Sequence, residues 1–121
     1  MAKVLGVGGV FFKSPDPKKL AAWYTRWLGL ENDGHGVSFK PATMPAKGVT
    51  VWAPFAETTK YFAPATREFM FNFVVDDLDE VMAQVRRGGG QQVGKIEEAD
   101  YGRFGWFLDP DGNKVELWQP K

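Results

Sequence analysis

Two segments of the chain have the spacing of apolar residues that is typical of a helix lying on a core. The first lies between Asp16 and Gly29, and its apolar side chains recur every three or four positions: Leu20, Trp23, Tyr24, Trp27 and Leu28. Asp16 is a favourable N-cap, Pro17 suits the first helical position, and Gly29 suits a left-handed helix stop. The pattern therefore predicts a helix that begins at Pro17 and ends before Gly29.

The second segment has the same kinds of capping residue at its two ends. Asp77 is the expected N-cap, and Glu80 stands three residues later, where it would complete a capping box. The inward positions are apolar, and the run ends at three consecutive glycines, 88–90. The inward residues are Leu78, Val81, Met82 and Val85. A second helix is expected between Asp77 and Gly88.

Similar apolar runs precede and follow the two helices. Residues 7–12 and 69–75 read as buried strands, each leading to a capping aspartate. Val49–Pro54 matches Val115–Pro120 at nearly the same offset as the two caps, although a short motif can also recur by chance. An internal duplication within one domain, 1–121, is the simplest explanation. Module one would span about 4–56 and module two about 68–121, joined by a connection over about 57–67 (Glu57 to Arg67).

The last hairpin can be assigned a register. Asp109–Asn113 has the composition of a three-residue loop around a type I turn, with Gly112 in the left-handed position. Trp106 then faces Glu116, Phe104 faces Trp118, and Leu108 faces Lys114, all on one side of the sheet. The other side carries only Gly105, Phe107, Val115 and Leu117. We expect this apolar side to lie under a helix.

The first side of the hairpin mixes aromatic rings with one carboxylate and one ammonium. This composition is typical of the wall of a ligand cavity. An exposed sheet face whose aromatic rings lie flat against the surface is the alternative.

Composition and charge narrow the function classes. Apolar residues make up 44% and charged residues 25% of the 121 residues, which indicates a folded globular domain. Fifteen basic residues balance fifteen acidic ones, so nucleic acid is not an expected partner. The chain has no cysteine, which excludes disulfides and thiolate chemistry. It has no long apolar run, so we expect no membrane partner and a cytoplasmic location.

Four stretches of the sequence together resemble a known family. They are Phe11–Asp16, Val75–Asp79, Tyr101–Trp106 and Asp109–Trp118. They look like the vicinal oxygen chelate (VOC) superfamily, which includes glyoxalase I, bleomycin-resistance proteins and extradiol dioxygenases. The resemblance implies an α+β fold in which two βαβββ modules with curled mixed sheets form a shared cleft. It also implies a homodimer.

The resemblance further implies a metal site at four inward strand positions, which fall here at Gly9, Thr50, Met70 and Glu116. Only Glu116 is a ligand of the family type, and a catalytic zinc site ordinarily has three protein ligands. We therefore expect no metal and no other cofactor, with a divalent ion held through Glu116 as the alternative. The single histidine, His35, lies in a turn-like segment without a second histidine to share an ion.

Two functions are open at this point. The first is a protein that binds a small aromatic or cationic molecule, with Glu116 pairing with a polar group of that molecule. The expected ligand-binding residues are Phe11, Thr50, Trp52, Met70, Phe104, Trp106, Lys114 and Trp118.

The second function is a glyoxalase-like lyase or isomerase that acts next to a carbonyl. Glu116 would be its general base or acid, or its metal ligand. Lys114 or Arg103 would anchor a substrate carboxylate, and Tyr101 would donate a hydrogen bond to a developing enolate. Each of these three residues also has a purely structural explanation, at a hairpin shoulder or a dimer contact.

Overall fold

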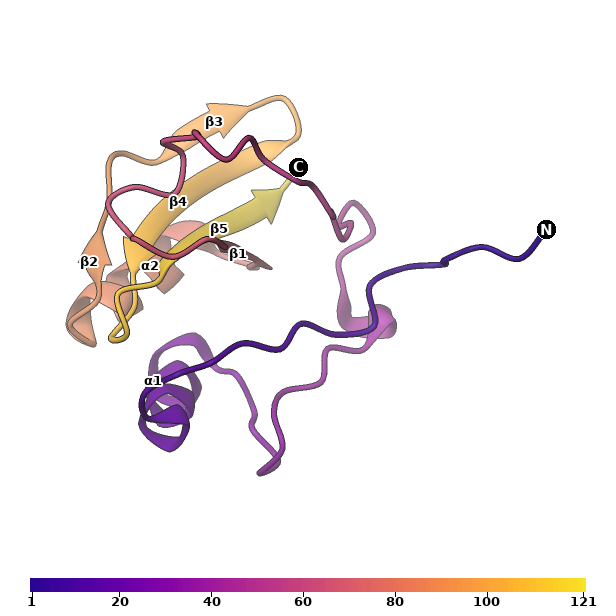
Figure 1. The fold of residues 1–121 in the computed structure, drawn as a ribbon. Helices are drawn as coiled ribbons and strands as arrows, with labels where there is room; N and C mark the ends of the chain where they lie inside the picture. Colours follow the sequence, from indigo (N-terminus) through magenta and orange to yellow (C-terminus); the bar gives the residue numbers. More distant parts are fainter.

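The computed structural model describes residues 1–121 (Figure 1). In chain order its elements are helix α1 (Pro17–Leu28), a 3-10 turn η1 (Pro41–Thr43), strand β1 (Phe71–Val74), helix α2 (Leu78–Arg87), and strands β2 (Gln91–Gln92), β3 (Glu97–Ala99), β4 (Gly102–Leu108) and β5 (Lys114–Pro120). All five strands come from the second half of the chain.

These strands form one open, mixed sheet. Its order is β1-β5-β4-β2, and β3 pairs with the same edge of β4 as β2 does. β1 runs parallel to β5, whereas the other pairs are antiparallel. β1 bonds only to β5, so its second edge has no partner strand. The α+β class predicted from the sequence is confirmed.

The hairpin of β4 and β5 has the predicted register. Trp106 lies opposite Glu116, Phe104 opposite Trp118, and Leu108 opposite Lys114. Gly112 closes the turn with a φ of 80°, a conformation that residues with a Cβ rarely adopt. Its N–H donates to the carbonyl of Asp109 at 2.9 Å. Local turn chemistry therefore fixes which side chains share a face.

The apolar side of the hairpin lies under the helices, as predicted. The side chains of Phe107, Val115 and Leu117 are fully buried there. They pack against Leu78, Met82 and Val85 of α2 and against Leu20 and Tyr24 of α1. This is the only extended core in the molecule, and it is built almost wholly from the second half and α1.

Both helices have the predicted N-caps, although the side chain of Glu80 does not return a bond to the N–H of Asp77, so the expected capping box is only half formed. Asp16 accepts a hydrogen bond from the N–H of Lys19 at 3.1 Å, and Asp77 accepts one from Glu80 at 3.0 Å. Gly29 ends α1 with a φ of 70°. Neither helix has both the length and the apolar composition needed to cross a bilayer.

Side chains of α1 tie it to the second half of the chain. The indole of Trp23 donates to the carbonyl of Gly88 at 2.8 Å, and the hydroxyl of Tyr24 donates to Asp109 at 2.8 Å. Burial beside the carboxylate of Asp109 raises the pKa of the Tyr24 phenol. The turn of the last hairpin is therefore anchored to the first helix.

The strands expected in the first half need correction. Segments 7–12 and 49–54 belong to no ladder in the single chain, and Figure 1 shows the first residues running away from the sheet. Phe11 is 96% exposed and Trp52 79% exposed. Every large exposed apolar side chain except Tyr101 lies within the first 61 residues. An apolar pattern favours an extended conformation, but a strand also needs a neighbour to bond its N–H and C=O groups, and a local pattern does not supply one.

Candidate functional site

The second side of the hairpin carries a row of stacked aromatic rings. Phe104 lies between two indoles, with its ring centroid 6.2 Å from that of Trp118 and 6.4 Å from that of Trp106. The interplanar angles of these pairs are 4° and 18°. Both tryptophans are 8% exposed although they lie on the side away from the core. The row forms a largely covered apolar wall, and Trp106 is the member of it that lines the cavity described below.

The carboxylate of Glu116 lies at one end of this wall and accepts hydrogen bonds from three different elements. The amide of Asn72, its neighbour across the β1–β5 pair, donates at 2.6 Å. The indole of Trp106 on β4 donates at 2.9 Å. The phenol of Tyr61, from the connection between the halves, donates to the same oxygen as Trp106 does. Three donors around one carboxylate satisfy both of its oxygens and fix its orientation.

Lys114 is the second charged group of the site. Its side chain is 8% exposed, and its ammonium donates to the carbonyl of Tyr61 at 2.6 Å. The same ammonium lies 5.1 Å from the centroid of the Tyr61 ring, in the range of a cation–π contact. Burial lowers the pKa of Lys114, and the negative charge of Glu116 opposes this shift. Burial and the bond to Glu116 raise the pKa of the Tyr61 phenol, which therefore keeps its proton at neutral pH.

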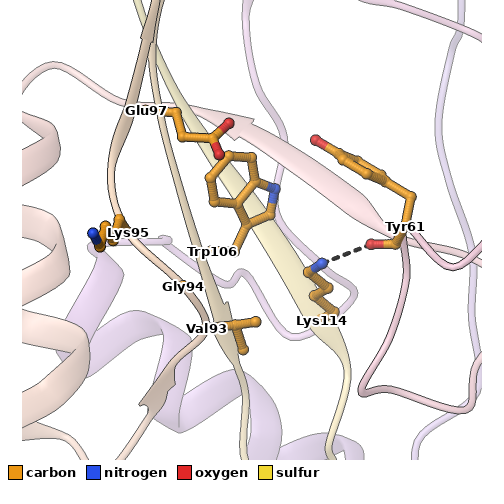
Figure 2. Close-up of a pocket in the computed structure, with 7 residues that line it drawn as sticks. All are labelled: Tyr61, Val93, Gly94, Lys95, Glu97, Trp106 and Lys114. Atoms are coloured by element: carbon orange, nitrogen blue, oxygen red, sulfur yellow. Dashed lines mark hydrogen bonds between the residues drawn. The ribbon is translucent and has the colours of Figure 1, made fainter.

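A cavity of about 200 Å³ opens beside these groups (Figure 2). It is lined by Tyr61, Val93, Gly94, Lys95, Glu97, Trp106 and Lys114. Figure 2 shows Trp106 in the middle, with Lys95 on one side and Tyr61 on the other. The N–H of Val93 still donates to the carbonyl of Trp106 at 2.8 Å, but residues 94–96 leave the edge of β4 before β3 begins, and this interruption of the ladder makes room for the cavity. The lining offers an apolar ring together with charges of both signs.

The structure brings only some of the expected binding residues together. Phe104, Trp106, Lys114, Glu116 and Trp118 share the second side of the hairpin, and of these Trp106 and Lys114 line the cavity. Three others, Phe11, Thr50 and Trp52, are exposed and outside the cavity of the single chain. Met70 is half-buried just before β1.

Arg103 and Tyr101 do not have the places that the enzyme hypothesis gave them. Arg103 points to the helix side, where its guanidinium lies 3.0 Å from the carboxylate of Asp79 and 3.2 Å from that of Glu98. Tyr101 is exposed, and its carbonyl accepts a hydrogen bond from the indole of Trp118. Neither residue lines the cavity. The alternation of side chains along β4 separates Arg103 from Trp106.

Sequence reasoning missed Asn72 and Tyr61. Asn72 is the one polar residue in the run 69–75, and it shares a strand face with Met70, the position expected from the resemblance. That interruption of an apolar strand was a usable signal. Tyr61 gave no such signal, because it lies in an irregular connection whose path depends on contacts made elsewhere.

The residues around Glu116 do not fit a transition-metal site within one chain. Its neighbours are an amide, an indole and a phenol, all acting as donors, and a lysine ammonium lies close by. The chain contains no group of three or more histidine, cysteine, aspartate or glutamate side chains that could hold an ion. His35 is exposed, and its N–H bonds to Asp33 in a local turn. We derive no chemical step through a metal.

Solved structures share this fold. The chain superimposes on a glyoxylase/bleomycin resistance protein/dioxygenase domain from Frankia sp. EAN1pec with a TM-score of 0.59 and 15% identity, over 98% of this chain and 100% of that one. It superimposes on TioX from Micromonospora sp. ML1 with a TM-score of 0.52 and 18% identity, over 89% and 90% of the two chains. The architecture is that of the glyoxalase/bleomycin-resistance/dioxygenase group.

Sequence comparison identifies the family. The family model described as a glyoxalase-like domain matches residues 9–118, and the chain belongs to this family. The predicted VOC resemblance is confirmed. The chain is also 30% identical over 118 residues to a protein of Mycobacterium bovis named "Putative glyoxylase CFP32". That match covers 91% of this chain and 44% of CFP32, so the chain spans less than half the length of this relative.

Proposed function

We propose that this protein binds a small aromatic molecule on the Phe104–Trp106–Trp118 wall, without a metal. The observation that carries the proposal is the Glu116 carboxylate, which is held by three donors at the end of that wall. A ring would stack on the indoles, and a hydroxyl, amine or ammonium on the ligand would bond to Glu116. Each aromatic pair contributes about 0.5–1.5 kcal/mol beyond the area that it buries.

The absence of a bound metal is part of this proposal. An ion at Glu116 would face the positive ends of three donors and the positive charge of Lys114, whereas a hydroxyl or amine of a ligand could take the place of one of these donors. Such a site lacks the further ligands that hold an ion tightly.

A second copy of the chain is proposed to complete the binding cleft. The apolar segments 7–12 and 49–54 repeat the strand patterns of the second half but have no ladder partner within one chain. The second edge of β1 is also unpaired. A homodimer would satisfy these groups and would bring Phe11, Thr50 and Trp52 to the wall. A cytoplasmic location stays a prediction.

A lyase or isomerase acting next to a carbonyl is the second candidate. The observation that favours it is the contact of the Tyr61 phenol with Glu116, because such a pair can pass a proton to or from a substrate. The name of the relative "Putative glyoxylase CFP32" is in line with the same candidate.

Ligand titration followed by tryptophan fluorescence and calorimetry tests the proposal. The probes are 2-naphthol and 1-naphthylmethylamine, added to protein treated with EDTA. We expect saturable binding that Trp106→Phe weakens several-fold, whereas the matched substitution Trp27→Phe in α1 leaves it unchanged. Binding that requires added metal, or near-stoichiometric metal in the purified protein, would contradict the proposal. For the enzyme candidate, Glu116→Gln should abolish turnover while the substrate still binds.

A further inference from the structure

Tyr61 occupies the polar end of the aromatic wall as a ligand would. It comes from the connection between the two halves, a segment of turns without helix or strand. Its hydroxyl donates to Glu116, its ring meets the ring of Trp106 edge-on at a centroid distance of 6.4 Å, and the Lys114 ammonium lies over its face. The ring of Phe55, from the same irregular part of the chain, stacks on Tyr61 at a centroid distance of 5.7 Å, so the hydroxyl, the edge and the faces of this phenol all have partners.

The backbone around Tyr61 is attached to the sheet by few bonds. Lys114 holds the carbonyl of Tyr61, and Arg67 reaches Asn113 at 3.2 Å and the carbonyl of Asp111 at 3.3 Å. The backbone hydrogen bonds of residues 59–65 are local turns within the connection. The Tyr61 side chain is still 39% exposed, unlike the 8% of the indole it contacts. A side chain held in this way can leave without disturbing the core.

The cavity continues from the place of Tyr61. Three of its lining residues, Tyr61, Trp106 and Lys114, are the phenol and two of its contacts. A molecule that replaced the Tyr61 ring would therefore gain the tyrosine's space in addition to the existing 200 Å³.

We propose that Tyr61 is an internal stand-in for the ligand, which means that it occupies the ligand's place when the site is empty. The site then binds a small molecule carrying a phenolic hydroxyl, which displaces Tyr61 from Glu116. The inference rests on the proposed binding function and narrows its ligand class to hydroxyaryl compounds. The incoming hydroxyl donates to Glu116, and its ring takes the place under Lys114. Because the tethered tyrosine competes for the same acceptor, the measured affinity of the intact protein is lower than that of the open site.

The test compares 2-naphthol with 2-methoxynaphthalene, which keeps the rings but cannot donate a hydrogen bond. Affinities are measured by calorimetry at neutral pH for the unaltered chain, Tyr61→Ala and the control Phe39→Ala, an exposed ring outside the cavity. We expect Tyr61→Ala to tighten 2-naphthol binding by about ten- to a hundredfold, the effect of one hydrogen bond to a charged group. Phe39→Ala should bind as the unaltered chain does, and the methoxy compound should bind far more weakly in every case.

The other outcomes separate this inference from the proposed function. If both naphthalenes bind equally well, the site binds aromatic molecules but does not select a hydroxyl, and the inference alone fails. If Tyr61→Ala weakens 2-naphthol binding, Tyr61 is part of the ligand wall and the stand-in role fails. If no variant binds either compound, both proposals fail. Tyr61→Phe keeps the ring and removes only the competing hydroxyl, so it should also tighten 2-naphthol binding if Tyr61→Ala does not fold.

Discussion

The two halves of this chain share a sequence pattern but reach different structures. Each has a capped helix preceded by an apolar run, and both end in the same Val-x-x-Trp-x-Pro motif, at 49–54 and 115–120. In the second half these pieces form a helix on a sheet with fully buried side chains. In the first half only the helix forms, and the strand-like segments stay exposed.

The difference shows how unequal the requirements of the two kinds of element are. A helix satisfies its backbone within one segment, so Asp16 and Gly29 suffice to define α1 once its apolar stripe finds a surface. The backbone N–H and C=O groups of a strand, in contrast, are satisfied only by a neighbouring strand. β5 lies between β4 and β1 in the sheet, whereas 49–54 has no counterpart beside it within one chain.

The largest expected effect is on the core of the second half. Phe107→Ala removes a fully buried ring from between the sheet and the helices and should lower the free energy of unfolding by about 3–5 kcal/mol. Phe11→Ala is the same substitution at a side chain that is 96% exposed, and it should cost less than about 0.5 kcal/mol in dilute protein. Urea denaturation measures both. Equal losses would show that the two halves share one core.

The next effect concerns one of the hydrogen bonds that join α1 to the second half of the chain. Tyr24→Phe removes the hydroxyl that donates to the buried carboxylate of Asp109 and should cost about 1–3 kcal/mol at neutral pH.

The same substitution should also change the dependence of stability on pH. The pKa of Tyr24 is raised above its ordinary value of 10.0 in the folded protein, so only the unfolded chain readily loses this proton. The resulting stability is complete below pH 10 and is lost as the pH rises further. Lys114, whose pKa is lowered, acts in the opposite direction but is common to both proteins. Denaturation series at pH 8 and pH 11 should therefore show a smaller loss in Tyr24→Phe, and parallel losses would contradict this reason.

A smaller effect is expected at the exposed apolar segments of the first half, if a second copy of the chain covers them. If a second copy pairs with segments 7–12 and 49–54, Trp52→Ala should raise the dissociation constant of the dimer by about tenfold or more. Sedimentation at several concentrations measures this, with Tyr101→Ala as the control at an exposed aromatic residue of the second half. An unaltered chain that stays monomeric throughout the micromolar range would rule out the homodimer.

The smallest effect compares the two caps. Asp16→Ala and Asp77→Ala each remove one side-chain bond to a first-turn N–H and should cost about 1 kcal/mol each. Thermal and urea denaturation should give similar losses, because both helices belong to the same core. A negligible loss for Asp16→Ala alone would show that α1 is not part of the cooperative unit.

Much of the site could be predicted from the sequence, and the missing part has a definite cause. The turn at Asp109–Asn113 set the register, and the register placed Trp106 beside Glu116 and Phe104 beside Trp118. The same alternation put Phe107 and Leu117 under the helices. These results follow from a side-chain period of two and a turn of known length, both of which are local.

The sequence by itself determined both helices with their caps, the last hairpin with its register, and the family to which the chain belongs. Only the tertiary structure decided that Asn72 and Tyr61 hold Glu116, and that the strand patterns of the first half find no partner within one chain. Caps and turns depend on residues a few positions apart. The position of Tyr61 and the pairing of a strand depend on backbone groups far along the chain, and no local pattern encodes where those groups come together.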